Sequence, residues 1–122
     1  MIDISTLIQQ AIGGDIKRDD AYSYCKANNT DISALWNSMA LFIAKAFHKC
    51  EMNYEDADRA MNSIWLQIVV DMEALGNDYE FPELAYSIYC AFDEGEFDHG
   101  DGDDPVEKYT KPTIEKIIKK TK

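Results

Sequence analysis

The sequence predicts an all-α fold: a single helical domain over residues 1–122, with five to six helices around a central antiparallel hairpin. Apolar residues recur at helical spacing in two long segments, about residues 32–50 and 54–75, which we expect to form this hairpin. No segment of useful length alternates apolar and polar residues as a strand does. With 122 residues, 46% of them hydrophobic, the chain can bury a core of its own.

The segment from Asn53 to Gly76 carries the clearest helix signals. Asn53 is a good N-cap, acids follow it in the first turn, and Gly76 stops the helix. On a helical wheel one apolar stripe, about six turns long, contains Met61 together with Tyr54, Ala57, Ile64, Trp65, Ile68, Met72 and Leu75. Leu66 and Val70 fall on the opposite side, so we expect the C-terminal half of this helix to be covered from two directions.

The segment 32–50 has the second strong helical pattern. Its inward face is expected to contain Met39 with Ile32, Leu35, Trp36, Phe42, Ile43, Ala46, Phe47 and Cys50. Asn37, Lys45 and His48 fall on the far side and are expected to be solvated. Because only residues 51–53 separate this helix from the next, the two must run antiparallel.

The remaining helices have shorter patterns. Asp3 caps a first helix that Gly13 and Gly14 end, and Asp15 is expected to cap a second helix over about residues 16–27. Pro82 fits the first position of a fifth helix that runs to about Phe92. Its inward residues are expected to be Phe81, Leu84, Ala85, Ile88 and Phe92.

A lysine-rich helix of about residues 112–121 ends the chain, with Ile114, Ile117 and Ile118 on its apolar side. Two interpretations of this tail are open. It packs across the molecule while its lysines shield the acidic segment described below, or it forms a separate basic contact. We favour the first, because an apolar stripe must be buried and opposite charges are close in the sequence.

Charge is unevenly distributed over the chain. The formal net charge is −11, yet residues 105–122 hold six lysines against two glutamates, a net of +4, so that the remainder carries −15. Such a field disfavours nucleic acid and anionic membrane, and it steers basic proteins toward the chain. The alternative is that the acidity serves only solubility.

Residues 93–104 form an acidic segment with seven acids, three glycines and no lysine or arginine, and we expect a loop there. Neither a start at Asp98 nor one at Asp101 gives the ligand spacing of a helix-loop-helix calcium site. Glu96 and His99 match half of a di-iron motif, but its second half is missing. We therefore predict no metal site and no cofactor.

No catalytic motif occurs, so we do not expect an enzyme. Cys25, Cys50 and Cys90 form no C-x-x-C pair, which favours reduced thiols in or near the core of a cytosolic protein. The sequence begins without a signal-peptide pattern, and its longest apolar runs are too short to span a membrane. A cytoplasmic location is the expectation.

Aromatic residues gather in sequence around the acidic segment, and tyrosine beside carboxylates suits the capture of lysine- and arginine-rich partners. The alternative is that these rings only pack around the fifth helix and have a structural role. The candidate partner-binding residues are Tyr86, Tyr89, Asp93, Glu94, Glu96, Asp98, Asp101, Asp103 and Asp104.

One block of sequence carries a resemblance. Residues 91–97 (AFDEGEF), followed by Asp104-Pro105 and by residues 108–112 (KYTKP), resemble the C-terminal pattern of some small bacterial proteins. Several such small acidic helical proteins are similar to immunity proteins of contact-dependent or polymorphic toxin systems. The resemblance covers the last third of the chain. It implies a stoichiometric blocker of a basic toxin domain, often a nuclease.

Two functional hypotheses follow. The first is an acidic protein-binding module, an immunity protein that neutralises a basic toxin by occluding its active or nucleic-acid-binding surface. The second is a helical structural or regulatory module that self-associates through exposed apolar residues such as Leu41, Leu66 or Val70. The chain is expected to be a monomer or a homodimer.

Overall fold

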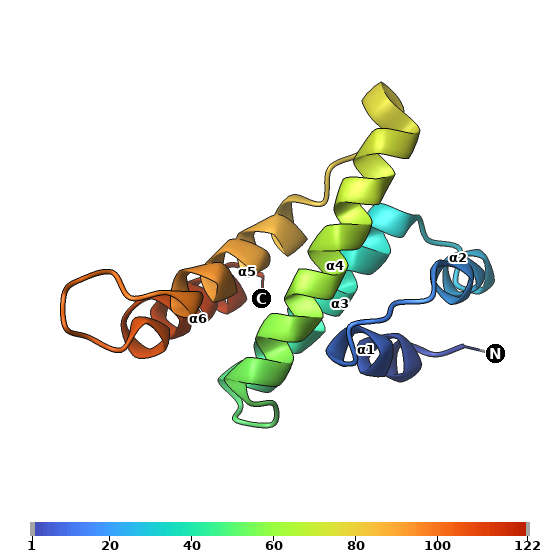
Figure 1. The fold of residues 1–122 in the computed structure, drawn as a ribbon. Coiled ribbons are helices and arrows are strands. Elements are labelled where there is room, and N and C mark those ends of the chain that lie inside the picture. Colours follow the sequence, from blue (N-terminus) through green and yellow to red (C-terminus); the bar gives the residue numbers. More distant parts are fainter. Residues whose placement is uncertain (1, 122) are drawn as a thin grey trace.

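A computed structural model describes residues 2–121, which are all-helical and contain no strand. The described residues form six α-helices, which are labelled in Figure 1. They are α1 (Ile4–Ile12), α2 (Arg18–Ala27), α3 (Ile32–His48), α4 (Tyr54–Leu75), α5 (Glu83–Asp93) and α6 (Lys111–Lys120). Short 3₁₀ turns follow α4 and α5 as η1 (Gly76–Asp78) and η2 (Glu94–Glu96), and a π-helical turn, η3 (Val106–Thr110), leads into α6.

Helices α3 and α4 form the predicted antiparallel hairpin at the centre of the molecule. Helices α1 and α2 lie on one side of this hairpin, and α5 and α6 lie on the other (Figure 1). The core lies where α3 and α4 meet these outer helices. Its largest fully buried side chains include Leu7, Trp36, Met39, Ile43, Met61, Ile64, Ile68, Ile88, Phe92 and Ile114.

Most helix ends follow their local signals. The side chains of Asp3, Asp31 and Asn53 each accept a hydrogen bond from the backbone N–H three residues later, as N-caps do. Gly76 ends α4 with a φ of 55°, in the left-handed region that favours glycine. The prediction that Asp15 caps the second helix is wrong. Instead α2 begins at Arg18 after Lys17, whose backbone N–H donates to the Gln10 side chain.

The segment 32–50 differs from the prediction at three positions. The helix ends at His48, and Cys50 has a φ of 63° and an exposed thiol because the chain reverses there. Phe42 is 44% exposed rather than inward. Asn37 is half-buried rather than solvated, because its carbonyl oxygen accepts the N–H of Ala85 and so caps the first turn of α5.

The prediction that α4 is covered from two directions is also wrong. Leu66 is 63% exposed and Val70 is 44% exposed. One flank of α4 packs on α1, where Ser63 donates to the carbonyl of Ala11, and the Arg18 side chain of α2 reaches Asp71 and Gln67 there. The other flank packs on α5 through Trp65. The outer face between these flanks is left to solvent.

A buried carboxylate joins four parts of the fold. Asp71 on α4 has no exposed surface, and its carboxylate pairs with Arg18 of α2. It also accepts the indole N–H of Trp36 on α3, over 2.7 Å, and the hydroxyl of Tyr79, over 3.0 Å. Three donors offset the cost of removing one carboxylate from water, so this network fixes α2 and the start of the α5 segment against the hairpin.

The C-terminal helix packs across the molecule. Ile114 and Ile118 are buried against α3 and α5, and the Thr110 hydroxyl donates to the carbonyl of Ala91 over 2.7 Å. Lys108, which precedes α6, contacts the acidic segment, so the predicted shielding is confirmed for this lysine. Two other lysines of the tail pair within it, namely Lys111 with Glu107 and Lys119 with Glu115. Among residues 2–121, no helix is both long enough and apolar enough to cross a membrane.

Candidate functional site

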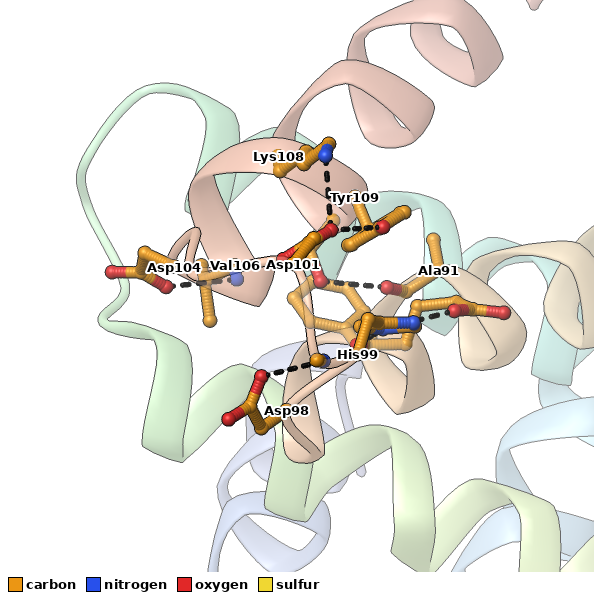
Figure 2. Close-up of polar contacts among 12 residues, drawn as sticks. Ala91, Asp98, His99, Asp101, Asp104, Val106, Lys108 and Tyr109 are labelled. Atoms are coloured by element: carbon orange, nitrogen blue, oxygen red, sulfur yellow. Dashed lines mark hydrogen bonds and ion pairs between the residues drawn. The ribbon is translucent and has the colours of Figure 1, made fainter.

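The structure divides the predicted acidic site into two parts with different surroundings. The distal part, residues 98–104, is folded by its own carboxylates. The side chains of Asp98, Asp101 and Asp104 each accept a backbone N–H two residues later, over 2.8 to 3.1 Å (Figure 2). These carboxylates hold the turns of the segment, as aspartates in tight turns commonly do.

Lysine and tyrosine side chains cover the distal part. Lys108 Nζ lies 2.9 Å from the carboxylate of Asp101 and 3.0 Å from that of Asp103. The hydroxyl of Tyr109 donates to the same Asp101 oxygen over 2.6 Å (Figure 2). These hydrogen bonds, first from Tyr109 and then from Lys108, hold the pKa of Asp101 well below its usual range. Asp101 and Asp103 therefore already have a cationic partner.

His99 closes the segment against the rest of the molecule. Its ring lies between those of Phe97 and Tyr109, with centroid distances of 4.3 and 3.9 Å. Its Nε2 lies 2.8 Å from the carbonyl oxygen of Glu94 and 3.3 Å from the Glu94 carboxylate (Figure 2). Glu94 thus faces the distal part of the acidic segment.

The proximal acids have a different setting. Asp93 and Glu96 lie beside Asp58 of α4, and the amide of Asn62 contacts Glu96 at 3.3 Å and Asp58 at 3.5 Å. We call Asp58, Asp93 and Glu96 the carboxylate cluster. Within the described chain, none of the three forms an ion pair. The cluster therefore holds negative charge that nothing in residues 2–121 neutralises.

A close backbone approach brings this cluster together. Gly95 is buried between its two acidic neighbours, and a Cβ there would collide with the hydroxyls of Thr110 and Tyr54. Because glycine has no side chain, η2 can lie directly against α4. The Tyr54 hydroxyl donates to the carbonyl of Phe92 over 2.6 Å and fixes the end of α5 at the same place.

The electrostatics of the cluster follow from this crowding. Burial, and then the hydrogen-bonded Glu96 carboxyl, raise the pKa of Asp58 to about 7. Burial, and then the fields of Glu96 and Glu94, also raise the pKa of Asp93. An approaching cation lowers the pKa of a carboxyl, so it would favour the ionised form of Asp58.

Four aromatic rings continue the same surface along α4 and α5. The rings of Trp65 and Tyr89 are stacked with centroids 5.0 Å apart, and Tyr86 lies 5.4 Å from Trp65 and 5.5 Å from Phe81. We call Trp65, Phe81, Tyr86 and Tyr89 the aromatic strip. Tyr86 is 39% exposed.

The strip adjoins the carboxylate cluster. Burial, and then the fields of Asp93 and Glu96, raise the pKa of Tyr89. The structure puts Tyr89 beside Asp93 and Glu96, whereas Tyr86, nearer the start of α5, lies against Trp65 and Phe81. Neither tyrosine takes part in the hydrogen-bonded network that Lys108 and Tyr109 form with Asp101 and Asp103.

Sequence reasoning missed Asp58 and Trp65 as members of this surface. Both lie on α4, far in sequence from the acidic segment, and Trp65 was placed only in the core stripe. Their spacing of seven residues puts them on the same side of a helix, so a search for acids beside aromatics at that spacing would have found the pair.

Two hollows of the surface lie away from the carboxylate cluster and the aromatic strip. Two depressions of about 270 and 550 Å³ share Phe47, Cys50 and Lys111, between the α3–α4 turn and the start of α6. The exposed Cys50 thiol corrects the expectation of three cysteines in or near the core, whereas Cys25 is buried and Cys90 half-buried. Residues 2–121 contain no group of three or more histidines, cysteines or acids arranged to hold a metal ion.

Comparison with protein-family models, with curated proteins and with solved structures gives no match for this chain.

Proposed function

We propose that the protein is an acidic protein-binding module that captures a basic protein through the carboxylate cluster and the aromatic strip. The observation that supports this function most strongly is the cluster itself, three carboxylates that form no ion pair beside partly exposed aromatic rings. A lysine or arginine of a partner supplies the missing charge, and the rings of Tyr86 and Tyr89 pack on its alkyl chain or guanidinium plane.

The partner that fits best is a basic toxin domain with a surface for nucleic acid. Such a surface must be positively charged, so an acidic protein of this size competes with nucleic acid for the same lysines and arginines. The chain then acts as an immunity protein that blocks the toxin by occupying its surface, without a chemical step. The distal acids Asp98 and Asp104 add to the long-range field that steers the partner inward.

Affinity capture tests this proposal. The tagged full-length chain is used as bait at low salt in an extract of the cells that produce it, and the retained proteins are identified by mass spectrometry. We expect one basic protein in equal amount, released by high salt, whose activity the chain inhibits on re-addition. A bait in which Asp58, Asp93 and Glu96 are neutralised serves as the matched control and should retain less of it. Recovery of the chain alone would contradict the proposal.

A second candidate function, self-association, is favoured by the exposure of Leu66 and Val70. Leu41, the third residue expected to mediate it, is half-buried. In this case the chain is a structural or regulatory module whose partner is a second copy. A dimer that depends on concentration but not on salt, and that Leu66→Glu disrupts in sedimentation equilibrium, would favour this function over the first.

A further inference from the structure

The outer face of α4 is the second unusual surface of the molecule. It lies between the flank that packs on α5 and the flank that packs on α1, and nothing passes in front of it in Figure 1. Leu66 and Val70 are one helical turn apart on this face, and they are 63% and 44% exposed. Two large apolar side chains at this spacing form the ridge along which helices commonly pack.

Acids border this apolar pair along the helix. Asp58 precedes Leu66 by eight residues, about 12 Å, and Glu73 follows it by seven, about 10 Å. On a helical wheel both acids point toward the α5 side of the outer face. An occupant three to four turns long therefore meets negative charge near each of its ends.

The basic residues near this face are already engaged. Arg59 contacts the carboxylate of Asp56 at 3.6 Å, and Arg18 is held by the buried Asp71. They are the only arginines of the chain, and α4 and α5 contain no lysine. The charge of the face therefore favours a basic occupant.

A second copy of the chain fits this face poorly. Each copy has a formal net charge of −11, and a symmetric dimer through α4 would bring its bordering acids toward those of the partner copy. A basic helix has no such conflict. It can cover the apolar pair with its own apolar residues and present lysines or arginines to the acids.

We infer that the outer face of α4 receives a basic amphipathic helix of the partner protein, with its apolar residues over Leu66 and Val70 and its cations at the carboxylate cluster and Glu73. This inference rests on the proposed function and specifies the kind of partner segment. The helix is at least three turns long and carries apolar residues at a spacing of three or four. Basic residues lie toward both of its ends.

Model peptides test the inference with the full chain. One probe is a synthetic 15-residue amphipathic peptide of leucine and lysine, and the control peptide has the same composition with the leucines spread around the helix. Each is titrated into ¹⁵N-labelled chain and followed by amide shifts and calorimetry. Four forms of the chain are compared. They are the unchanged chain, a Leu66→Ser/Val70→Ser variant, an Asp58→Asn/Glu96→Gln variant, and a Phe42→Ser control that removes an exposed apolar ring of α3 instead.

We expect the amphipathic peptide to bind the unchanged chain at least tenfold more tightly than the control peptide, with amide shifts centred on residues 58–73. The Leu66→Ser/Val70→Ser variant should lose this preference, and the Phe42→Ser variant should keep it. Circular dichroism of both variants shows whether the fold is retained. Since the substituted side chains are exposed, we expect unchanged spectra.

Other results would overturn the inference, and they separate it from the proposed function. If both peptides bind equally and only neutralisation of Asp58 and Glu96 weakens them, the helix inference fails and the acidic capture surface remains. If neither peptide binds, both proposals are contradicted. If the unchanged chain is a dimer that the Leu66→Ser/Val70→Ser variant disrupts, the occupant of the face is a second copy, and the helix inference fails.

Discussion

Asp71 and Asp58 lie on the same helix and have opposite surroundings. Asp71 is fully buried and has three donors, namely the guanidinium of Arg18, the indole N–H of Trp36 and the hydroxyl of Tyr79. Asp58 is half-buried beside the carboxyls of Glu96 and Asp93, and burial first, then these carboxyls, raise its pKa. The more deeply buried carboxylate is therefore the better satisfied one.

This difference separates structural from functional charge. A buried carboxylate that every neighbour stabilises holds the fold together, and removing it leaves its donors without an acceptor. A carboxylate crowded by other acids costs stability, and such groups are found where a protein binds a cation or a substrate. We therefore assign Asp71 to the fold and propose Asp58 for the contact with the partner.

Removal of Asp71 should have the largest effect. We expect Asp71→Ala to lower the free energy of unfolding by about 3 kcal/mol, because Trp36 and Tyr79 lose their acceptor and Arg18 loses its anionic partner. Urea unfolding of the full chain measures the change. Glu73→Ala, which removes an exposed acid two residues away, should change the free energy by less than about 0.5 kcal/mol. A loss below about 1 kcal/mol in Asp71→Ala would mean that the buried network contributes little.

Neutralisation of the carboxylate cluster should have the next largest effect, and it acts on binding. Two triple variants change the net charge equally, and they are Asp58→Asn/Asp93→Asn/Glu96→Gln and Asp98→Asn/Asp101→Asn/Asp103→Asn. With a captured basic partner, the first should weaken affinity at least tenfold, about 1.4 kcal/mol. The second should mainly slow association, because Lys108 already partners Asp101 and Asp103.

Calorimetry and stopped-flow association, each at several salt concentrations, distinguish the two triple variants. If both triple variants changed affinity and association rate equally, only the total charge would determine binding. The distinction between the proximal and distal acids would then be lost.

The pH dependence of stability tests the crowding of Asp58. Its pKa is raised to about 7 in the folded chain, so the folded state binds more protons than the unfolded state between about pH 4 and pH 7. The contribution of Asp58 to the free energy of unfolding therefore falls as pH rises from about 4 to about 7. Asp58→Asn should remove this loss and be more stable than the unchanged chain at pH 7, by about 1 kcal/mol after allowance for solvent screening.

Urea unfolding of both chains at several pH values measures this difference, which should vanish near pH 4. A difference that is independent of pH would show that Asp58 ionises normally in the folded chain.

The smallest effect on global stability is expected in the distal part of the acidic segment. Asp101→Ala removes the acceptor shared by Tyr109, Lys108 and the backbone N–H of Asp103. We expect faster amide exchange in residues 98–104 and no resolved change in the urea midpoint, because these contacts lie on the surface. If the midpoint shifts as in Asp71→Ala, the segment is part of the cooperative fold.

The fold was more predictable than the candidate site. Helices depend on residues close together in the sequence, whereas the site depends on residues far apart in it. Asn53 and Gly76 mark the ends of α4 through bonds within the helix, and both predictions are confirmed. The errors in the predicted fold mainly concern which face of a helix is buried, not whether the helix forms. Helical spacing places Leu66 and Val70 on one side, but only the positions of α1, α2 and α5 decide that this side meets solvent.

The sequence by itself determined that the chain is helical and that its longest helices pair, because caps, glycines and apolar spacing act within a few residues. Only the tertiary structure decided which acids have partners. Arg18 reaches Asp71 across 53 positions and Lys108 reaches back to Asp101, while Asp58 and Glu96 meet from separate elements without a cation. A carboxylate is stabilised or left crowded by whatever lies within a few ångströms of it, and folding sets those neighbours.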